Sequence, residues 1–257
     1  MDKVRLQAHR GVSTDYPENT MSAFRGAVEQ GYEIIELDPA VTADGVIIIM
    51  HDSTLNRTGR TINGEKLSPD KKVCETNYSE IQQYEFGSWF DEKFTGEKAP
   101  LFEEVLRFAE KENVVLKIDN KFERFEPTIM EKFLNMLKCT TAKIAFTCAK
   151  LDTVKTLKGT FSDAEFHYDG VVTEEILQEL NAVVGRDKLT VWLPHKNENT
   201  TWVKMEFIHK ELAELVKKYA DLGVWILSKE EEYVDVQQYG VNVIETTGSI
   251  KPTKTNI

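Results

Sequence analysis

Two carboxylates, Glu36 and Asp38, stand two residues apart at the end of the apolar run Glu-Ile-Ile-Glu-Leu-Asp. Side chains alternate along a β-strand, so these two point to one face, about 6.5 Å apart by the strand rise. The two negative charges repel each other, and a hard cation between them removes the repulsion because Ca²⁺ and Mg²⁺ prefer oxygen ligands. Asp119, which ends a later apolar run, is a candidate third ligand. Structural ion pairs are the alternative that the spacing alone leaves open.

A histidine, His51, follows the next apolar run, and the intervening segment 42–45 (Thr-Ala-Asp-Gly) is typical of a hairpin turn. If Asp44 and Gly45 form a two-residue loop, the numbers of paired residues add up to 89, as 44 and 45 do. This register predicts His51 directly opposite Asp38, on the same face. A slip of one residue would turn its side chain to the other face.

Further groups suited to phosphate chemistry end two of the apolar runs. His9 and Arg10 close the first run, and Lys121 lies two residues after Asp119. Imidazole transfers protons near neutral pH, and the guanidinium fork matches a phosphate group. A lysine adds positive charge beside a phosphate oxygen. Each residue alone is an ordinary strand end, but together they indicate a site that handles a phosphate ester.

The scaffold that would bring these residues together is predicted by alternating strand-like and helix-like segments. Strands are expected over 4–8, 33–38, 114–119, 143–147, 165–168, 189–193, 223–227 and 241–244. Helices are expected over 20–30, 101–112, 126–138, 150–158, 173–183, 205–220 and 229–239. Such alternation favours parallel strands with right-handed crossovers, and eight units predict an α/β protein with a closed (β/α)8 TIM barrel.

The long gap between the second strand and its helix predicts an insertion into the barrel. We expect one domain over 1–257, with an inserted subdomain of roughly 52–98. Insertions in such barrels usually lie in the loops that follow strands, on the face where active sites form.

The composition narrows the class of protein. The chain has 257 residues, 41% hydrophobic and 29% charged, which is typical of a globular domain with a large core. A net charge of -11 argues against nucleic acid as a partner. The three cysteines include no C-x-x-C pair and predict neither a disulfide framework nor a zinc site.

No segment of the sequence predicts a membrane anchor. The longest aliphatic run, 46–50, is too short to span a bilayer. No leader peptide precedes the first strand, which begins by Val4 and fits a cytoplasmic protein. A periplasmic or secreted protein would have lost its leader, so the compartment stays open, as does the oligomeric state.

Taken together, these segments resemble the glycerophosphodiester phosphodiesterase family. The resemblance is carried by AHRG (8–11), PENT (17–20), ELD (36–38), TADG (42–45), HDSTLNRT (51–58), GSWF (87–90) and APLFEEVL (99–106), and more loosely by GVWIL (223–227) and YGVNVIETT (239–247). It implies a TIM barrel with a small insertion after the second strand. It also implies a metal-dependent hydrolase that cleaves small-molecule glycerophosphodiesters to glycerol 3-phosphate and an alcohol.

The resemblance further implies a role for each residue of the site. The general acid and base are expected to be His9 and His51. The ligands of one divalent cation, Ca²⁺ or Mg²⁺, are expected to be Glu36, Asp38 and Asp119. The residues on the substrate side are expected to be Arg10, Lys121, Trp225 and Glu18, the last supporting the site from the first loop.

Two other functions stay open. The first is a phospholipase D or sphingomyelinase D-like enzyme that acts on lipid head groups, and an exposed aromatic lip such as GSWF (87–90) would favour it. The second is a non-catalytic phosphodiester-binding protein with a decayed site. Three departures from the residues that are usual in the family motivate this second reading. The family usually has the longer Glu where this chain has Asp119, and the segments after the last two strands also differ, with Ile-Leu-Ser after Trp225 and the pair Thr246-Thr247.

Overall fold

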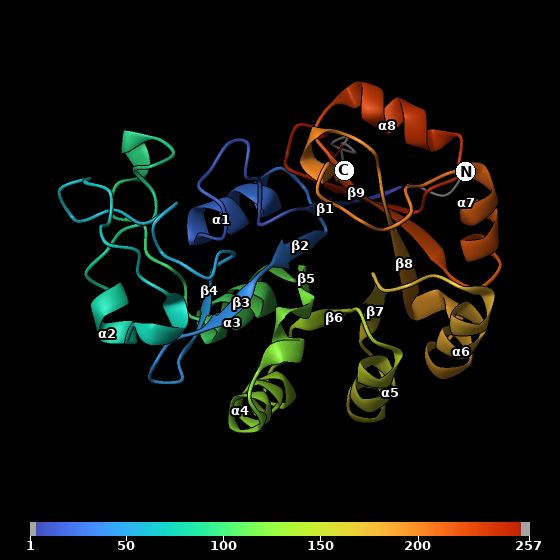
Figure 1. Ribbon diagram of the computed structural model, residues 1–257, viewed down its shortest axis with the longest axis horizontal. Helices are drawn as coiled ribbons and strands as arrows, with labels where there is room; N and C mark the ends of the chain where they lie inside the picture. The colour runs from blue at the N-terminus through green and yellow to red at the C-terminus, as the bar shows by residue number, and fades with distance from the viewer. Residues whose placement is uncertain (1–3, 253–257) are drawn as a thin grey trace.

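Eight parallel strands close into a barrel in the computed structural model, which describes residues 4–252 (Figure 1). Their order around the barrel is β1-β10-β9-β8-β7-β6-β5-β2. The strands are β1 (Arg5–Ala8), β2 (Ile34–Leu37), β5 (Val115–Ile118), β6 (Lys143–Cys148), β7 (Glu165–Tyr168), β8 (Leu189–Pro194), β9 (Asp221–Leu227) and β10 (Val243–Thr246). The predicted (β/α)8 TIM barrel is confirmed.

Helices that connect the strands lie outside this barrel (Figure 1). They are α1 (Met21–Glu29), α3 (Phe102–Glu112), α4 (Pro127–Lys138), α5 (Leu151–Thr160), α6 (Glu174–Val184), α7 (Lys210–Lys217) and α8 (Glu230–Gln237). Thr20 begins α1 by accepting a hydrogen bond from the backbone nitrogen of Ala23, and Asn113 ends α3 in the left-handed conformation. None of the helices within residues 4–252 is long and apolar enough to cross a membrane.

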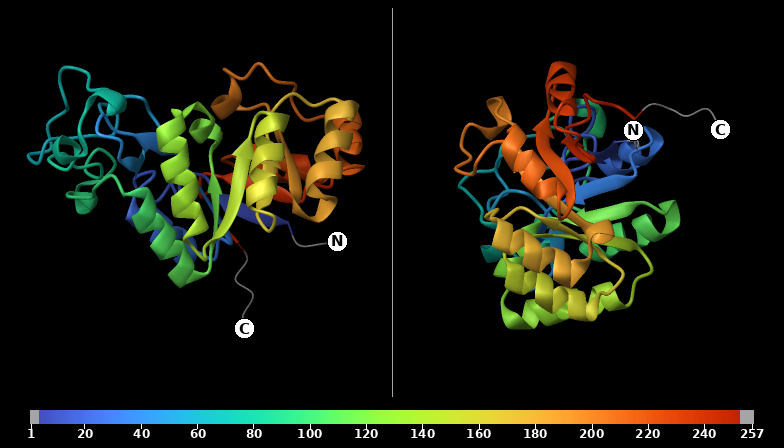
Figure 2. Two further views of the ribbon diagram at one scale, coloured as in Figure 1. Left: turned by 90° about the horizontal axis from the view of Figure 1, so that it is seen from below. Right: turned by 90° about the vertical axis from the view of Figure 1, so that its right-hand side faces the viewer.

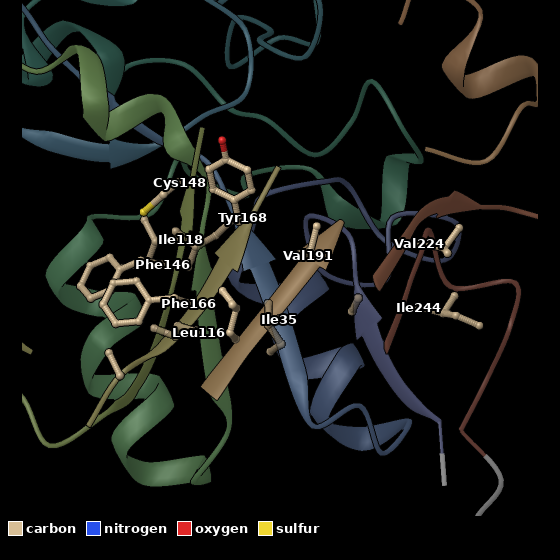
Figure 3. Packing of buried hydrophobic residues seen from close by; sticks show 14 of the residues in the cluster. Ile35, Leu116, Ile118, Phe146, Cys148, Phe166, Tyr168, Val191, Val224 and Ile244 are labelled. Atoms are coloured by element: carbon tan, nitrogen blue, oxygen red, sulfur yellow. The ribbon is translucent and has the colours of Figure 1, made fainter. Parts of the chain in front are cut away.

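Strand side chains alternate between two very different environments. Those that point outward pack against the helices as an apolar layer, of which Figure 3 shows Ile35, Leu116, Ile118, Phe146, Cys148, Phe166, Tyr168, Val191, Val224 and Ile244. Those that point inward include buried polar and charged groups, among them Gln7, Glu36, Lys117, His167 and Glu245. Buried charges need partners, so the barrel interior is built around paired groups.

The segment 39–100 between β2 and α3 packs around a hydrophobic cluster of its own. It contains β3 (Pro39–Val41), β4 (Ile47–Ile49) and α2 (Tyr78–Ile81). Its buried members are Ile48, Met50, Leu55, Leu67, Val73, Ile81, Phe86 and Ala99. Figures 1 and 2 show the segment projecting to one side of the barrel. The subdomain boundaries of roughly 52–98 remain a prediction.

The predicted register of the β3–β4 hairpin is wrong by one residue. Pro39 pairs with Ile49 and Val41 with Ile47, so the paired numbers add up to 88 rather than 89. The turn uses three residues, 43–45, because Thr42 donates its backbone nitrogen to the oxygen of Val46 and Gly45 takes a φ of 73°. The partner of Asp38 is consequently Met50, whose backbone nitrogen donates to the backbone oxygen of Asp38 at 2.8 Å.

Two further predicted boundaries are also wrong. The helix expected over 205–220 begins only at Lys210, because the nitrogen of Ile208 donates to the oxygen of Pro194 and holds this segment against the end of β8. The strand expected over 241–244 is displaced to 243–246. Its last residue, Thr246, accepts a hydrogen bond from the backbone of His9.

Candidate active site

Three carboxylates meet at the carboxyl ends of β2 and β5. One oxygen each from Glu36, Asp38 and Asp119 lies within 4.8 Å of the others. Burial and the charge of Asp38 raise the pKa of Glu36 well above its ordinary value, and the same two causes raise the pKa of Asp119. Burial and repulsion from Asp38 therefore disfavour the charged forms of Glu36 and Asp119 unless a cation lies beside them. Three carboxylates in this arrangement are a donor set that fits a hard divalent cation.

Asp38 is the member of the cluster that meets positive charge. Its Oδ1 forms an ion pair with Lys121 Nζ, and its Oδ2 lies 3.4 Å from Arg10 Nε. Although burial acts to raise it, Lys121 and Arg10 hold the pKa of Asp38 below its ordinary value. Both cations expected on the substrate side thus lie beside the carboxylate cluster, and their contact with phosphate stays a prediction.

The loop after β1 takes an uncommon backbone conformation to reach this cluster. Arg10, Gly11 and Asn19 have φ values of 57°, 78° and 55°. A Cβ atom on Gly11 would lie 2.7 Å from that of Ala23, so only glycine fits. In this turn the backbone nitrogen of Arg10 donates a hydrogen bond to Glu36 Oε2, and Asn19 Nδ2 donates to Asp38 Oδ2 at 2.7 Å. Backbone strain of this kind is concentrated at functional sites.

A chain of hydrogen bonds connects His51 to this loop. His51 Nδ1 and Asp52 Oδ1 are 2.7 Å apart, and the hydrogen bond from His51 is the largest cause of the lowered pKa of Asp52. Arg57 joins the two ends of the chain, because it donates to Asp52 Oδ2 at 2.6 Å and to Glu18 Oε1 at 2.7 Å. Glu18 Oε1 in turn accepts from Arg10 Nη1 at 2.9 Å.

His9 directly follows β1, and its backbone nitrogen donates to the oxygen of Thr246 in β10. Burial first, and then the charge of Arg10, lower the pKa of His9 well below its ordinary value, so its imidazole is neutral at pH 7. Arg10, the residue after His9, donates its backbone nitrogen to Glu36 Oε2, and Met50, the residue before His51, donates its backbone nitrogen to the backbone oxygen of Asp38. The structure therefore brings both predicted histidines to the rim that carries the carboxylates, although the hairpin register differs from the predicted one.

Trp225 lies at the end of β9, with its ring centroid 6.2 Å from that of Trp202. Trp202, on the loop after β8, is 72% exposed, so an aromatic pair stands at this part of the mouth. The indole nitrogen of Trp225 is buried and has no hydrogen-bond partner among the residues described. Its contact with a substrate stays a prediction.

Sequence reasoning missed several groups of the site. Asp52 and Arg57 lie within the quoted segment 51–58 but were not singled out. Asp169 follows β7, accepts from Asn120 Nδ2 at 3.1 Å, and has its pKa raised to about 6 by burial and by Asp119. The sequence pattern does not single out Glu245, because it predicts that the strand ends at residue 244, whereas β10 continues to Thr246. The charge of Glu245 at the end of an apolar run was the available signal.

The sequence also matches a described family of proteins. The sequence model of the Glycerophosphoryl diester phosphodiesterase family matches residues 9–243. The chain belongs to this family. The match covers every residue that we singled out as an acid, a base or a cation ligand.

Individual curated proteins match this chain over part of their length. The chain is 36% identical over 137 residues to the glycerophosphodiester phosphodiesterase of Caldanaerobacter subterraneus subsp. tengcongensis, covering 53% of each chain. It is 36% identical over 132 residues to the uncharacterized protein YqiK of Bacillus subtilis, covering 49% of this chain and 51% of that protein. The matched region thus spans about half the length of these relatives.

Solved structures of several phosphodiesterases share the fold of this chain. One is an Oleispira antarctica phosphodiesterase in complex with the product sn-glycerol-3-phosphate, with a TM-score of 0.77 and 18% identity, covering 95% of this chain and 93% of that chain. Another is the glycerophosphodiester phosphodiesterase of Thermotoga maritima, with a TM-score of 0.65 and 21% identity, covering 97% and 96%. At these identities the likeness concerns the barrel fold.

Proposed function

We propose that this chain is a metal-dependent glycerophosphodiester phosphodiesterase, which hydrolyses its substrate to glycerol 3-phosphate and an alcohol. The observation that carries the proposal is the group of three carboxylates, with oxygens within 4.8 Å of one another, on the rim that also carries His9 and His51. Membership of the phosphodiesterase family supports the same activity. Glu36, Asp38 and Asp119 would hold one divalent cation, either Ca²⁺ or Mg²⁺.

When bound, the cation supplies positive charge that offsets the negative charge developing on the phosphate. Arg10 and Lys121 bind the phosphate oxygens, for which they leave their ion pairs with Asp38. His9, which is neutral at pH 7, takes the proton of the attacking oxygen, whether from water or from a neighbouring substrate hydroxyl. His51 gives a proton to the leaving alcohol, and Asp52 fixes the orientation of its ring.

The test is a panel of glycerophosphodiesters with choline, ethanolamine and glycerol head groups. The wild-type protein is assayed with EDTA and with Mg²⁺, Ca²⁺ or Mn²⁺ added back. We expect turnover that EDTA abolishes and a divalent cation restores. His9→Ala and His51→Ala should each lower kcat by about 100-fold or more, the usual contribution of a general acid or base. His209→Ala, at the exposed start of α7, is the matched control and should keep wild-type kcat.

Each alternative function gives a different outcome in the same assay. Faster cleavage of lysophosphatidylcholine than of glycerophosphocholine would instead favour an enzyme of lipid head groups. Binding of the diesters without turnover, with any of the three cations, would favour a non-catalytic binding protein. Wild-type rates in both His9→Ala and His51→Ala would refute the proposed roles of the histidines.

A further inference from the structure

Beneath the carboxylate cluster, the barrel interior holds an ion pair that the proposed function does not use. The side chains of Lys117 on β5 and Glu245 on β10 are 7% and 6% exposed, and Lys117 Nζ donates to Glu245 Oε2 at 2.8 Å. Gln7 on β1 donates its side-chain nitrogen to the same oxygen. Burying two charges is costly, and apolar side chains of similar volume often replace such a pair without loss of stability. The pair therefore calls for a reason other than stability.

The neighbours of Lys117 hold it in one position. Its ammonium group lies 4.3 Å from the ring centroid of Trp192, a cation–π contact. The indole nitrogen of Trp192 donates to His167 Nδ1 at 2.9 Å. Gly223 leaves the space for this indole, since a Cβ atom there would lie 2.6 Å from Trp192 Cδ2. The carboxylate of Glu245 is thus fixed through groups from five strands, β1, β5, β7, β8 and β9.

The two oxygens of Glu245 have different neighbours. Oε2 accepts from Lys117 and Gln7, whereas Oε1 faces the imidazole of His9, 3.8 Å from Nε2. We propose that Glu245 is a positioning residue for His9. Its carboxylate keeps the proton of the neutral imidazole on Nε2, so that Nδ1 is free to exchange a proton with the substrate. Contacts of catalytic groups are often long until substrate is bound, and 3.8 Å is within reach of a small side-chain rotation.

The same arrangement is present at the other histidine. Asp52 lies 2.7 Å from His51 Nδ1 and, like Glu245, is not a member of the carboxylate cluster. Each histidine thus has a carboxylate of its own on one side of the ring. A carboxylate in this place sets the tautomer and the orientation of an imidazole. The inference rests on the proposed function, which gives His9 its part in proton transfer.

The test compares Glu245→Gln with the double variant Lys117→Met/Glu245→Gln, which removes both buried charges. We expect Glu245→Gln to lower kcat at least tenfold with KM unchanged. We expect the double variant to fold, by circular dichroism and Tm, and to remain as slow, because the balanced charge does not restore a partner for His9. The control removes an ion pair outside the barrel, between Lys155 in α5 and Glu179 in α6, as Lys155→Met/Glu179→Gln. It should keep kcat within twofold.

A second readout needs no turnover. Imidazole ¹⁵N spectra of the Mg²⁺-loaded protein, with the His9 signals assigned by their loss in His9→Ala, report which ring nitrogen carries the proton. We expect Nε2–H in the wild-type protein and a mixture of tautomers in Glu245→Gln.

The inference is overturned if the double variant recovers wild-type kcat, because the ion pair then serves stability alone. It is equally overturned if the wild-type tautomer is Nδ1–H or if Glu245→Gln leaves the spectrum unchanged. Should the double variant not fold, the spectrum of Glu245→Gln decides. A wild-type protein that cleaves no diester would refute the proposed function, and the spectrum would still show whether Glu245 sets the tautomer of His9.

Discussion

Because His167 is buried in the barrel interior, we predict that the protein loses a measurable part of its stability in mild acid. His167 is fully buried and its Nδ1 accepts a hydrogen bond from Trp192, so its proton is on Nε2. Burial is the largest cause that lowers the pKa of His167 from 6.5 to about 4. Between these two values the unfolded chain binds a proton that the folded chain does not. The free energy of unfolding therefore falls as the pH falls from 6.5 to 4.

The size of the loss follows from this difference in pKa. One unit of pKa corresponds to about 1.4 kcal/mol, which gives a total of about 3 kcal/mol and about 2 kcal/mol by pH 5. His167→Gln keeps an acceptor for the indole of Trp192 and removes the titrating group. Urea unfolding at pH 7 and pH 5, followed by tryptophan fluorescence, measures both proteins.

The wild-type protein should lose about 2 kcal/mol more than His167→Gln between these two pH values. Titrating groups that do not contact His167 act on both proteins and cancel in the comparison. Asp169 is one of them, and it acts in the opposite direction because its folded pKa is raised to about 6. Equal losses in the two proteins would refute the reasoning.

Three further predictions concern the site and the packing. Asp52→Asn should lower kcat by about 100-fold or more and leave Mg²⁺ affinity by calorimetry unchanged, because Asp52 orients His51 and is not in the carboxylate cluster. Gly159→Ala in α5 should raise stability by about 0.5–1 kcal/mol, since a Cβ there meets nothing within 4 Å, and Gly87→Ala should lower Tm because its Cβ would overlap the backbone oxygen of Phe94. Phe122→Ala should cost about 3–5 kcal/mol in urea unfolding, because the ring is fully buried and stacks on Phe133. An unchanged kcat, reversed signs for the two glycines, or a loss below 1 kcal/mol at Phe122 would contradict the respective prediction.

The barrel and the convergence of its site could be predicted because both follow from local patterns. Alternating strand and helix signals define the eight units, and strand parity places Glu36, Asp38 and Asp119 on the inward face. The register of the hairpin could not be predicted with the same certainty. A two-residue and a three-residue turn differ by one hydrogen bond, here that of Thr42 with Val46.

The partners of the site residues could not be predicted, because they depend on contacts between distant parts of the chain. Arg57 meets Glu18 across 39 positions, and Lys117 meets Glu245 across 128. Each pair consists of ordinary charged residues when read along the sequence. Only the closed barrel and the packing of segment 39–100 bring the members of each pair together.

His51 lies in the segment 39–100 and not on a barrel strand. The residues of the proposed site therefore come from two parts of the molecule. His51 follows the β3–β4 hairpin, in which the backbone nitrogen of Met50 donates to the backbone oxygen of Asp38, directly after β2. The three carboxylates belong to the barrel itself. Under the proposed mechanism, cation binding requires only the barrel, whereas turnover also requires the hairpin that carries His51. Under that mechanism, changes to segment 39–100 would alter turnover and leave the three carboxylates of the barrel in place.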